Sequence, residues 1–128
     1  MTKLFVREAE SDDLRRALIG QHVVVSDLAI TEVTSAMHRL GREGVLTHAD
    51  VVGVLAAVHR GIEAAEPFAI NQLTQHLARQ MFALDVPLRT LDALHLAAAI
   101  QSNCRMLVTY DRRLVEAALA VGLSAGHA

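Results

Sequence analysis

Three carboxylates, Asp92, Asp111 and Glu32, could together carry chemistry, and Asp92 is the clearest. Asp92 lies in the apolar run Leu91–Ile100, so a helix packed on a sheet would carry its charge toward the interior. A buried carboxylate without a partner costs several kcal/mol or takes up a proton, and a bound cation would offset that cost. Taken alone, Asp92 fits equally well as a first-turn acid behind a Thr90 cap, stabilised by the helix dipole.

Asp111 and Glu32 are weaker candidates when each is considered alone. Asp111 directly follows the predicted strand Met106–Thr109, and ligands bind at the carboxyl ends of the strands in parallel α/β sheets. The simpler interpretation is an ordinary N-cap, because Asp is among the best capping residues. Glu32 lies on the flank of the apolar face of a predicted helix, where a solvated side chain is the simpler interpretation.

If one fold brings Glu32, Asp92 and Asp111 together, they indicate phosphodiester hydrolysis. Clustered carboxylates repel one another, so the cluster is stable only with protons or with hard divalent cations such as Mg²⁺, which prefer oxygen ligands. A metal ion there lowers the pKa of an attacking water and stabilises charge on the phosphate and the leaving oxygen.

The elements that would position these acids alternate between helix and strand. The sequence predicts two helices joined near Glu10 between Leu4 and Ile19, the second one capped at Ser11. β-Branched and apolar runs predict strands, and apolar spacing with capping residues predicts helices. The predicted strands are His22–Ser26, a weak candidate at Pro67–Ile70, Met106–Thr109 and an edge strand at the end. Three predicted helices begin near Leu28, at Thr47 and at Asn71, and two further helices cover Leu91–Ile100 and Arg112–Ala120. This order predicts an α/β layer fold with parallel strands.

Composition narrows the class of protein. The chain has 128 residues, the size of one domain, and a net charge of -2, which excludes a generally basic nucleic-acid coat. The one cysteine, Cys104, cannot form an internal disulfide, and no signal peptide or membrane segment is recognisable, so we expect a cytoplasmic protein. The histidines show no zinc-binding spacing, and His95 is expected to be a core residue hydrogen-bonded to a carboxylate.

Three segments around the acids resemble a known family. Val25–Val33, Leu91–Ala99 and Val108–Leu114 look like the second, third and fourth acidic motifs of PIN-domain proteins. The pattern is closest to the VapC toxins, and the likeness runs from about Leu4 to Gly122. Each motif alone is modest, but their order and separation make the set fairly specific.

The resemblance implies a PIN-like three-layer fold, a small parallel sheet flanked by helices, and a metal-dependent endoribonuclease toxin of a type II toxin–antitoxin system. Glu32, Asp92 and Asp111 would be catalytic residues that hold Mg²⁺ or Mn²⁺. Thr109, two residues before the last acid, and Arg112 and Arg113 would contact the substrate. The implied partners are an RNA substrate, a cognate antitoxin and a second copy of the chain.

The chain departs from the family at its start. PIN domains open with a strand that ends in an Asp-Thr-Ser-Ala or similar motif, whereas Thr2–Glu8 looks like the helix that follows it. We therefore expect residues 1–128 to form a single PIN-like domain that is N-terminally incomplete, without its first strand and first aspartate. A catalytically silent PIN-like protein that binds an antitoxin or RNA is the alternative, and a plain helical interaction module is a weaker third.

Overall fold

The computed structural model describes residues 3–7 and 19–126, which form a parallel sheet between two layers of helices. The strands lie in the order β3-β2-β1-β4-β5, and all four neighbouring pairs are parallel. The described elements are β1 (Lys3–Val6), β2 (His22–Ser26), α2 (Asp27–Arg42), α3 (His48–Glu63), β3 (Glu66–Phe68), α4 (Gln72–Met81), α5 (Thr90–Gln101), β4 (Met106–Val108), α6 (Arg112–Ala120) and β5 (Ser124–Gly126). The predicted α/β three-layer fold is confirmed.

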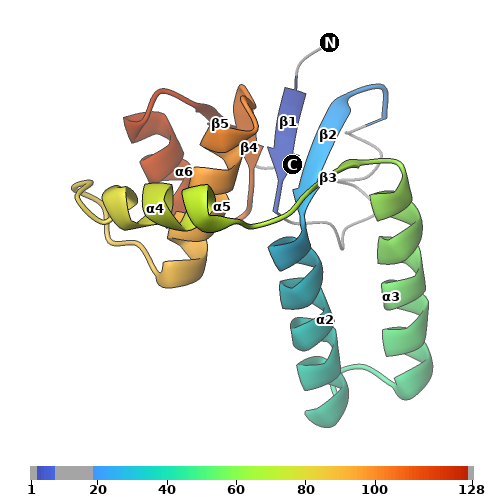
Figure 1. Cartoon of the computed structure of the whole chain (residues 1–128). Helices are drawn as coiled ribbons and strands as arrows, with labels where there is room; N and C mark the ends of the chain where they lie inside the picture. Colours follow the sequence, from blue (N-terminus) through green and yellow to red (C-terminus); the bar gives the residue numbers. More distant parts are fainter. Residues whose placement is uncertain (1–2, 8–18, 127–128) are drawn as a thin grey trace.

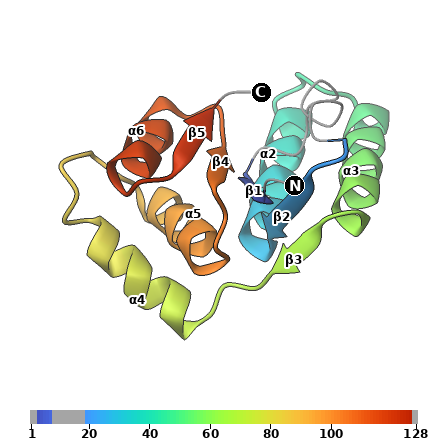
Figure 2. The same ribbon diagram turned by 90° about the horizontal axis from the view of Figure 1, so that it is seen from above.

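The two helical layers cover opposite faces of the sheet (Figure 1 and Figure 2). On one face, Phe5 of β1 packs in a cluster with residues of α5 and α6, and α4 lies against α5. On the other face, Leu4 and Val6 pack with Ala29 of α2. Since successive side chains of a strand point to opposite faces, one short strand contributes to both halves of the core.

The N-terminal segment contradicts the sequence prediction. Lys3–Val6, which the sequence predicts to be helical, is strand β1, and it pairs with β2 on one side and with β4 on the other. The central strand position is therefore filled, and the predicted absence of a strand there is wrong. The periodicity of a short apolar run does not show whether the run forms a helix or a strand. Here the pairing of Lys3–Val6 with two distant strands makes this segment a strand. The remainder of the two predicted N-terminal helices, including the Ser11 cap, lies outside the described residues.

The other elements follow their local signals. Thr47 caps α3 and Asn71 caps α4, as the sequence predicts. The structure adds that each cap is a reciprocal box, with Asp50 in α3 and with Thr74 in α4. Ser26 caps α2, with its Oγ accepting a hydrogen bond of 3.1 Å from the backbone N–H of Ala29. Within the described part of the chain, no helix is long and apolar enough to cross a membrane.

Truncating Phe5 tests the central position of β1. Phe5 has 0% exposure, so Phe5→Ala should lower the free energy of unfolding by about 3–5 kcal/mol. Phe82→Ala is the matched control, because Phe82 is 50% exposed, and it should change stability by about 0.5 kcal/mol or less. Urea unfolding of the two variants measures the difference. Similar losses for both would contradict the buried position of β1.

Candidate active site

The predicted acids come from three elements that meet at one edge of the sheet. Glu32 lies in the second turn of α2, which begins directly after β2. Asp92 lies in the first turn of α5, and Asp111 is the N-cap of α6, three residues after the end of β4. Because β2 and β4 are parallel strands on either side of β1, their carboxyl ends deliver Glu32 and Asp111 to the same region.

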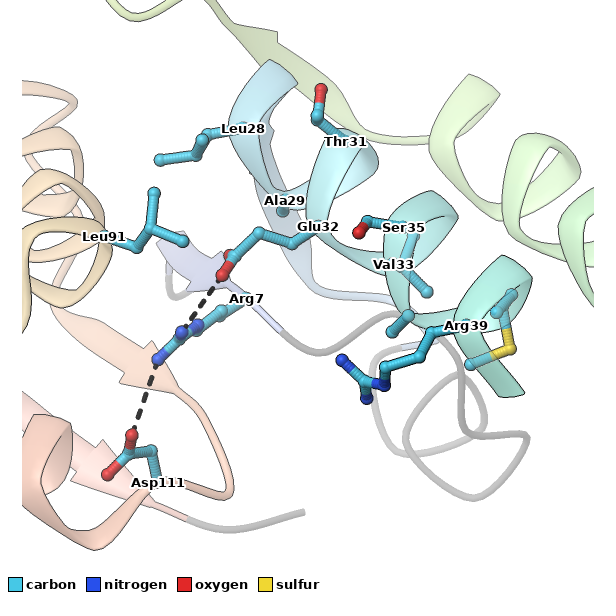
Figure 3. A pocket seen from close by; sticks show the side chains of 12 residues that line it. Arg7, Leu28, Ala29, Thr31, Glu32, Val33, Ser35, Arg39, Leu91 and Asp111 are labelled. Carbon is cyan, nitrogen blue, oxygen red and sulfur yellow. Dashed lines mark hydrogen bonds and ion pairs between the residues drawn. The ribbon is translucent and has the colours of Figure 1, made fainter. Parts of the chain in front are cut away.

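Arg7 follows the last residue of β1 and contacts all three acids. Its guanidinium donates a 2.9 Å hydrogen bond to Asp92 Oδ1 and a 3.2 Å bond to Glu32 Oε2. The distance from Arg7 Nη1 to Asp111 Oδ2 is 3.8 Å. Figure 3 shows the Arg7 side chain between Glu32 and Asp111. The structure therefore brings the three carboxylates together around Arg7, a residue that sequence reasoning missed, while their catalytic role stays a prediction.

Asp92 is a buried acid and a first-turn acid at the same time. It is 2% exposed. Its Oδ1 accepts from Arg7, and its Oδ2 accepts a 3.2 Å bond from the backbone N–H of Arg89. The N-cap of α5 is Arg89 rather than Thr90, which is the first residue of the helix. Asp92 is therefore a first-turn acid, but its expected Thr90 cap is wrong, and its role as a metal ligand stays a prediction.

Glu32 is held by His95 as well as by Arg7. The Nε2 atom of His95, a residue with 0% exposure, is hydrogen-bonded to Glu32 Oε1. A carboxylate only accepts, so Nε2 carries the proton. His95 Nδ1 is buried without a hydrogen-bond partner among the described residues, and the ring meets Phe5 edge-on with a centroid distance of 6.4 Å. The sequence-based expectation of a core histidine bonded to a carboxylate is confirmed.

The pKa of Glu32 reflects these neighbours. Burial raises the pKa of this carboxyl, but the hydrogen bonds from His95 and Arg7 and the positive charge of Arg7 outweigh burial and hold the pKa below its ordinary value of 4.5. Glu32 is therefore held in its ionised form.

Asp111 and Thr109 organise the turn after β4. Asp111 Oδ1 accepts a 2.9 Å bond from the backbone N–H of Arg113, and Thr109 Oγ1 accepts a 3.1 Å bond from the backbone N–H of Asp111. Thr109 has 0% exposure, which favours a positioning role over direct contact with a substrate. Arg112 and Arg113 are exposed beside Asp111, and their part in substrate binding stays a prediction.

A cleft of about 540 Å³ opens beside the acids. Glu32, Asp111 and Arg7 line it together with apolar side chains from α2 and with Leu91. Arg39, which pairs with Glu43 across 4.0 Å in an exposed position, also lines it. Two cations, Arg7 and Arg39, therefore line the cleft, and Arg side chains commonly contact phosphates.

The described side chains do not fit a divalent cation in this arrangement. Each of the six carboxylate oxygens of Glu32, Asp92 and Asp111 already meets His95, a backbone N–H or Arg7. Among the described residues, no three His, Cys, Asp or Glu side chains are grouped so that they could hold a metal ion. Arg7 supplies the positive charge between the acids.

The fold and the acidic site define an α/β protein with carboxylates at the carboxyl edge of a parallel sheet. Comparison with known proteins identifies the family. The PIN-domain family model matches residues 2–119, so this chain belongs to the PIN-domain family. Ribonuclease VapC46 from Mycobacterium tuberculosis is 35% identical over 127 residues, which cover 97% of this chain and 88% of that protein.

Solved structures share the fold at low sequence identity. PAE2754 from Pyrobaculum aerophilum superposes with a TM-score of 0.70 and 18% identity over 97% of this chain and 83% of that one. DNA-bound VapBC from Salmonella typhimurium superposes with a TM-score of 0.69 and 14% identity over 99% of this chain and 98% of that one.

The depressed pKa of Glu32 predicts a pH dependence of stability. A carboxyl whose pKa is lower in the folded than in the unfolded state stabilises the fold at every pH above its pKa in the unfolded state. This stabilisation is lost as the pH falls through its pKa in the folded state. Thermal melts should therefore show that the wild-type chain loses stability below about pH 4.5 more steeply than Glu32→Gln.

The exposed Glu116 of α6 provides the control for this measurement. Glu116→Gln should keep the wild-type pH dependence. If the profile of Glu32→Gln coincided with that of the wild type, Glu32 would not be held ionised by His95 and Arg7.

Proposed function

We propose that this chain is an endoribonuclease toxin of the VapC type, which hydrolyses RNA phosphodiester bonds. The supporting observation is that Glu32, Asp92 and Asp111 gather around one point at the carboxyl edge of the sheet, in a chain that belongs to the PIN-domain family. The relative VapC46, which is similar over nearly the whole chain, is named a ribonuclease. RNA is therefore the proposed substrate.

The proposed roles follow the positions of the side chains. Glu32, Asp92 and Asp111 are the proposed catalytic acids and the proposed ligands of Mg²⁺ or Mn²⁺, because carboxylate oxygens suit both ions. Since Arg7 now lies between these acids, metal-dependent catalysis requires the Arg7 side chain to move away. Arg112 and Arg113, exposed beside Asp111, would contact the RNA phosphates.

The VapC resemblance also supports proposals about partners and location. A cognate antitoxin protein and a second copy of this chain are the proposed partners, and the cytoplasm is the proposed compartment.

A second function is favoured by Arg7. A guanidinium that satisfies the acids from within the chain removes the need for a metal ion, which suits a catalytically silent PIN-like protein that binds an antitoxin or RNA. The same carboxylates would then stabilise the fold instead of reacting.

Substitution of Asp92 separates the two functions. With Mg²⁺ or Mn²⁺, a chain extended upstream by a strand that ends in Asp-Thr-Ser-Ala should cleave a mixed RNA pool, and Asp92→Asn in that chain should abolish cleavage because an amide is a poorer ligand for a hard cation. Asp85→Asn changes an exposed aspartate outside the cleft and should retain wild-type cleavage. Gel analysis of RNA fragments, with circular dichroism to match folding, measures the effect.

The outcomes of this experiment are distinct. Undiminished cleavage by folded Asp92→Asn would refute the role of Asp92. A folded wild-type chain that binds RNA or an antitoxin but cleaves nothing with either metal would favour the silent function.

We also propose that residues 1–128 are a single PIN-like domain that is incomplete in its first acidic motif, because β1 is followed by Arg7 and not by an aspartate. A chain extended upstream by a strand ending in Asp-Thr-Ser-Ala should compete with Lys3–Val6 for the centre of the sheet and bring a fourth carboxylate. That extended chain should cleave RNA faster and melt at a higher temperature than the 128-residue chain. Equal cleavage rates and equal melting temperatures would argue against this proposal.

A further inference from the structure

We infer that Arg7 is the built-in counter-cation of the acidic site and that it excludes divalent metal ions from it. This inference rests on the proposed role of Glu32, Asp92 and Asp111 as metal ligands. It adds that the chain itself controls whether these ligands are available.

The position of Arg7 is set by the sheet. Its backbone N–H donates a 3.1 Å hydrogen bond to Val108 O, so the β1–β4 ladder extends to this residue. β1 lies between β2 and β4, and the side chain therefore starts midway between the strand ends that lead to Glu32 and to Asp111. The topology delivers the guanidinium to the acids, and Figure 3 shows it between Glu32 and Asp111.

The contacts of Arg7 suit a guanidinium. Its two terminal nitrogens meet different carboxylates, with Nη2 3.2 Å from Glu32 Oε2 and Nη1 2.9 Å from Asp92 Oδ1. The side chain of Arg7 is 14% exposed and that of Asp92 is 3% exposed, so water screens this pair poorly. The planar fork of donors can bridge separate carboxylates, which a lysine ammonium does less well.

A divalent cation and Arg7 compete for the same place. Mg²⁺ and Mn²⁺ require oxygen ligands that are not already engaged and a position a few ångströms from each carboxylate. Arg7 engages one oxygen of Glu32 and one of Asp92, and it lies 3.8 Å from an oxygen of Asp111. Two cations this close repel each other strongly outside bulk water. Removal of the Arg7 charge should therefore open the metal site.

A Mn²⁺ titration tests whether Arg7 excludes metal ions from the site. The electron paramagnetic resonance signal of the free ion measures how much Mn²⁺ is bound. Arg7→Met keeps much of the side-chain volume and removes the charge, so it should bind Mn²⁺ about tenfold or more tightly than the wild-type chain. Arg7→Lys keeps the charge and should stay within about twofold of the wild type. Arg39→Ala removes another arginine that lines the same cleft and should not tighten Mn²⁺ binding.

Thermal melts give a readout that is independent of affinity. Without metal, Arg7→Met leaves buried Asp92 without its ionic partner and should melt below the wild type. Mn²⁺ should raise the melting temperature of Arg7→Met through binding to the folded state and leave that of the wild type nearly unchanged. If Arg7→Met is unfolded without metal, folding on addition of Mn²⁺ supports the inference, and failure to fold at saturating Mn²⁺ overturns it.

RNA cleavage separates this inference from the proposed function. Tighter Mn²⁺ binding by Arg7→Met without any cleavage would support the inference and contradict the endoribonuclease function. Equally tight Mn²⁺ binding by the wild type and Arg7→Met would overturn the inference, whatever the cleavage activity.

Discussion

The ion pair between Arg7 and Asp92 is the interaction on which the site depends. The Asp92 side chain is 3% exposed, and its Oδ1 lies 2.9 Å from Arg7 Nη1. The backbone N–H of Arg89 compensates only part of the desolvation of an ionised carboxylate at that depth, and the cation beside it compensates more. Arg7 can reach it because β1 occupies the centre of the sheet. The position of β1 and the burial of Asp92 therefore support each other.

Helix α5 couples this pair to the rest of the acidic site. Asp92 and His95 are three residues apart and so project from the same side of the helix. Asp92 contacts Arg7, His95 contacts Glu32 of α2, and Arg7 also contacts Glu32. The resulting closed set of contacts joins both helical layers through the end of β1. Its cost is the Nδ1 atom of His95, which has no hydrogen-bond partner among the described residues. A well-packed core rarely leaves such a buried polar group unsatisfied.

The site combines the acids expected of a PIN domain with a cation that belongs to the chain. Three carboxylates and one guanidinium leave a net negative charge, which is spread over Glu32, Asp92 and the more exposed Asp111. The side chain of Asp111 is 37% exposed, and solvent there can share the charge that Arg7 does not neutralise. In the proposed metal-binding state, a divalent cation would supply the positive charge that Arg7 supplies in the state that the structure describes.

The sequence by itself determined the elements with strong local signals and the identity of the acids. The β-branched run of β2, the capping residues Thr47 and Asn71 and the nearly all-apolar helix α5 carry their structure in a few adjacent residues, so they could be predicted. Asp92 could be singled out because its charge interrupts the apolar pattern of α5.

Only the tertiary structure decided how the N-terminal segment and the site are built. Lys3–Val6 is a strand because it pairs with β2 and β4, and β4 lies about a hundred residues further along the chain. His95 finds Glu32 across 63 positions, and Arg7 finds Asp92 across 85. The local sequence around a residue predicts its helix or strand and the face on which it lies. It does not predict which distant charged residue will lie beside it in the protein interior. The role of Arg7 therefore depends on long-range strand order, which local sequence does not encode.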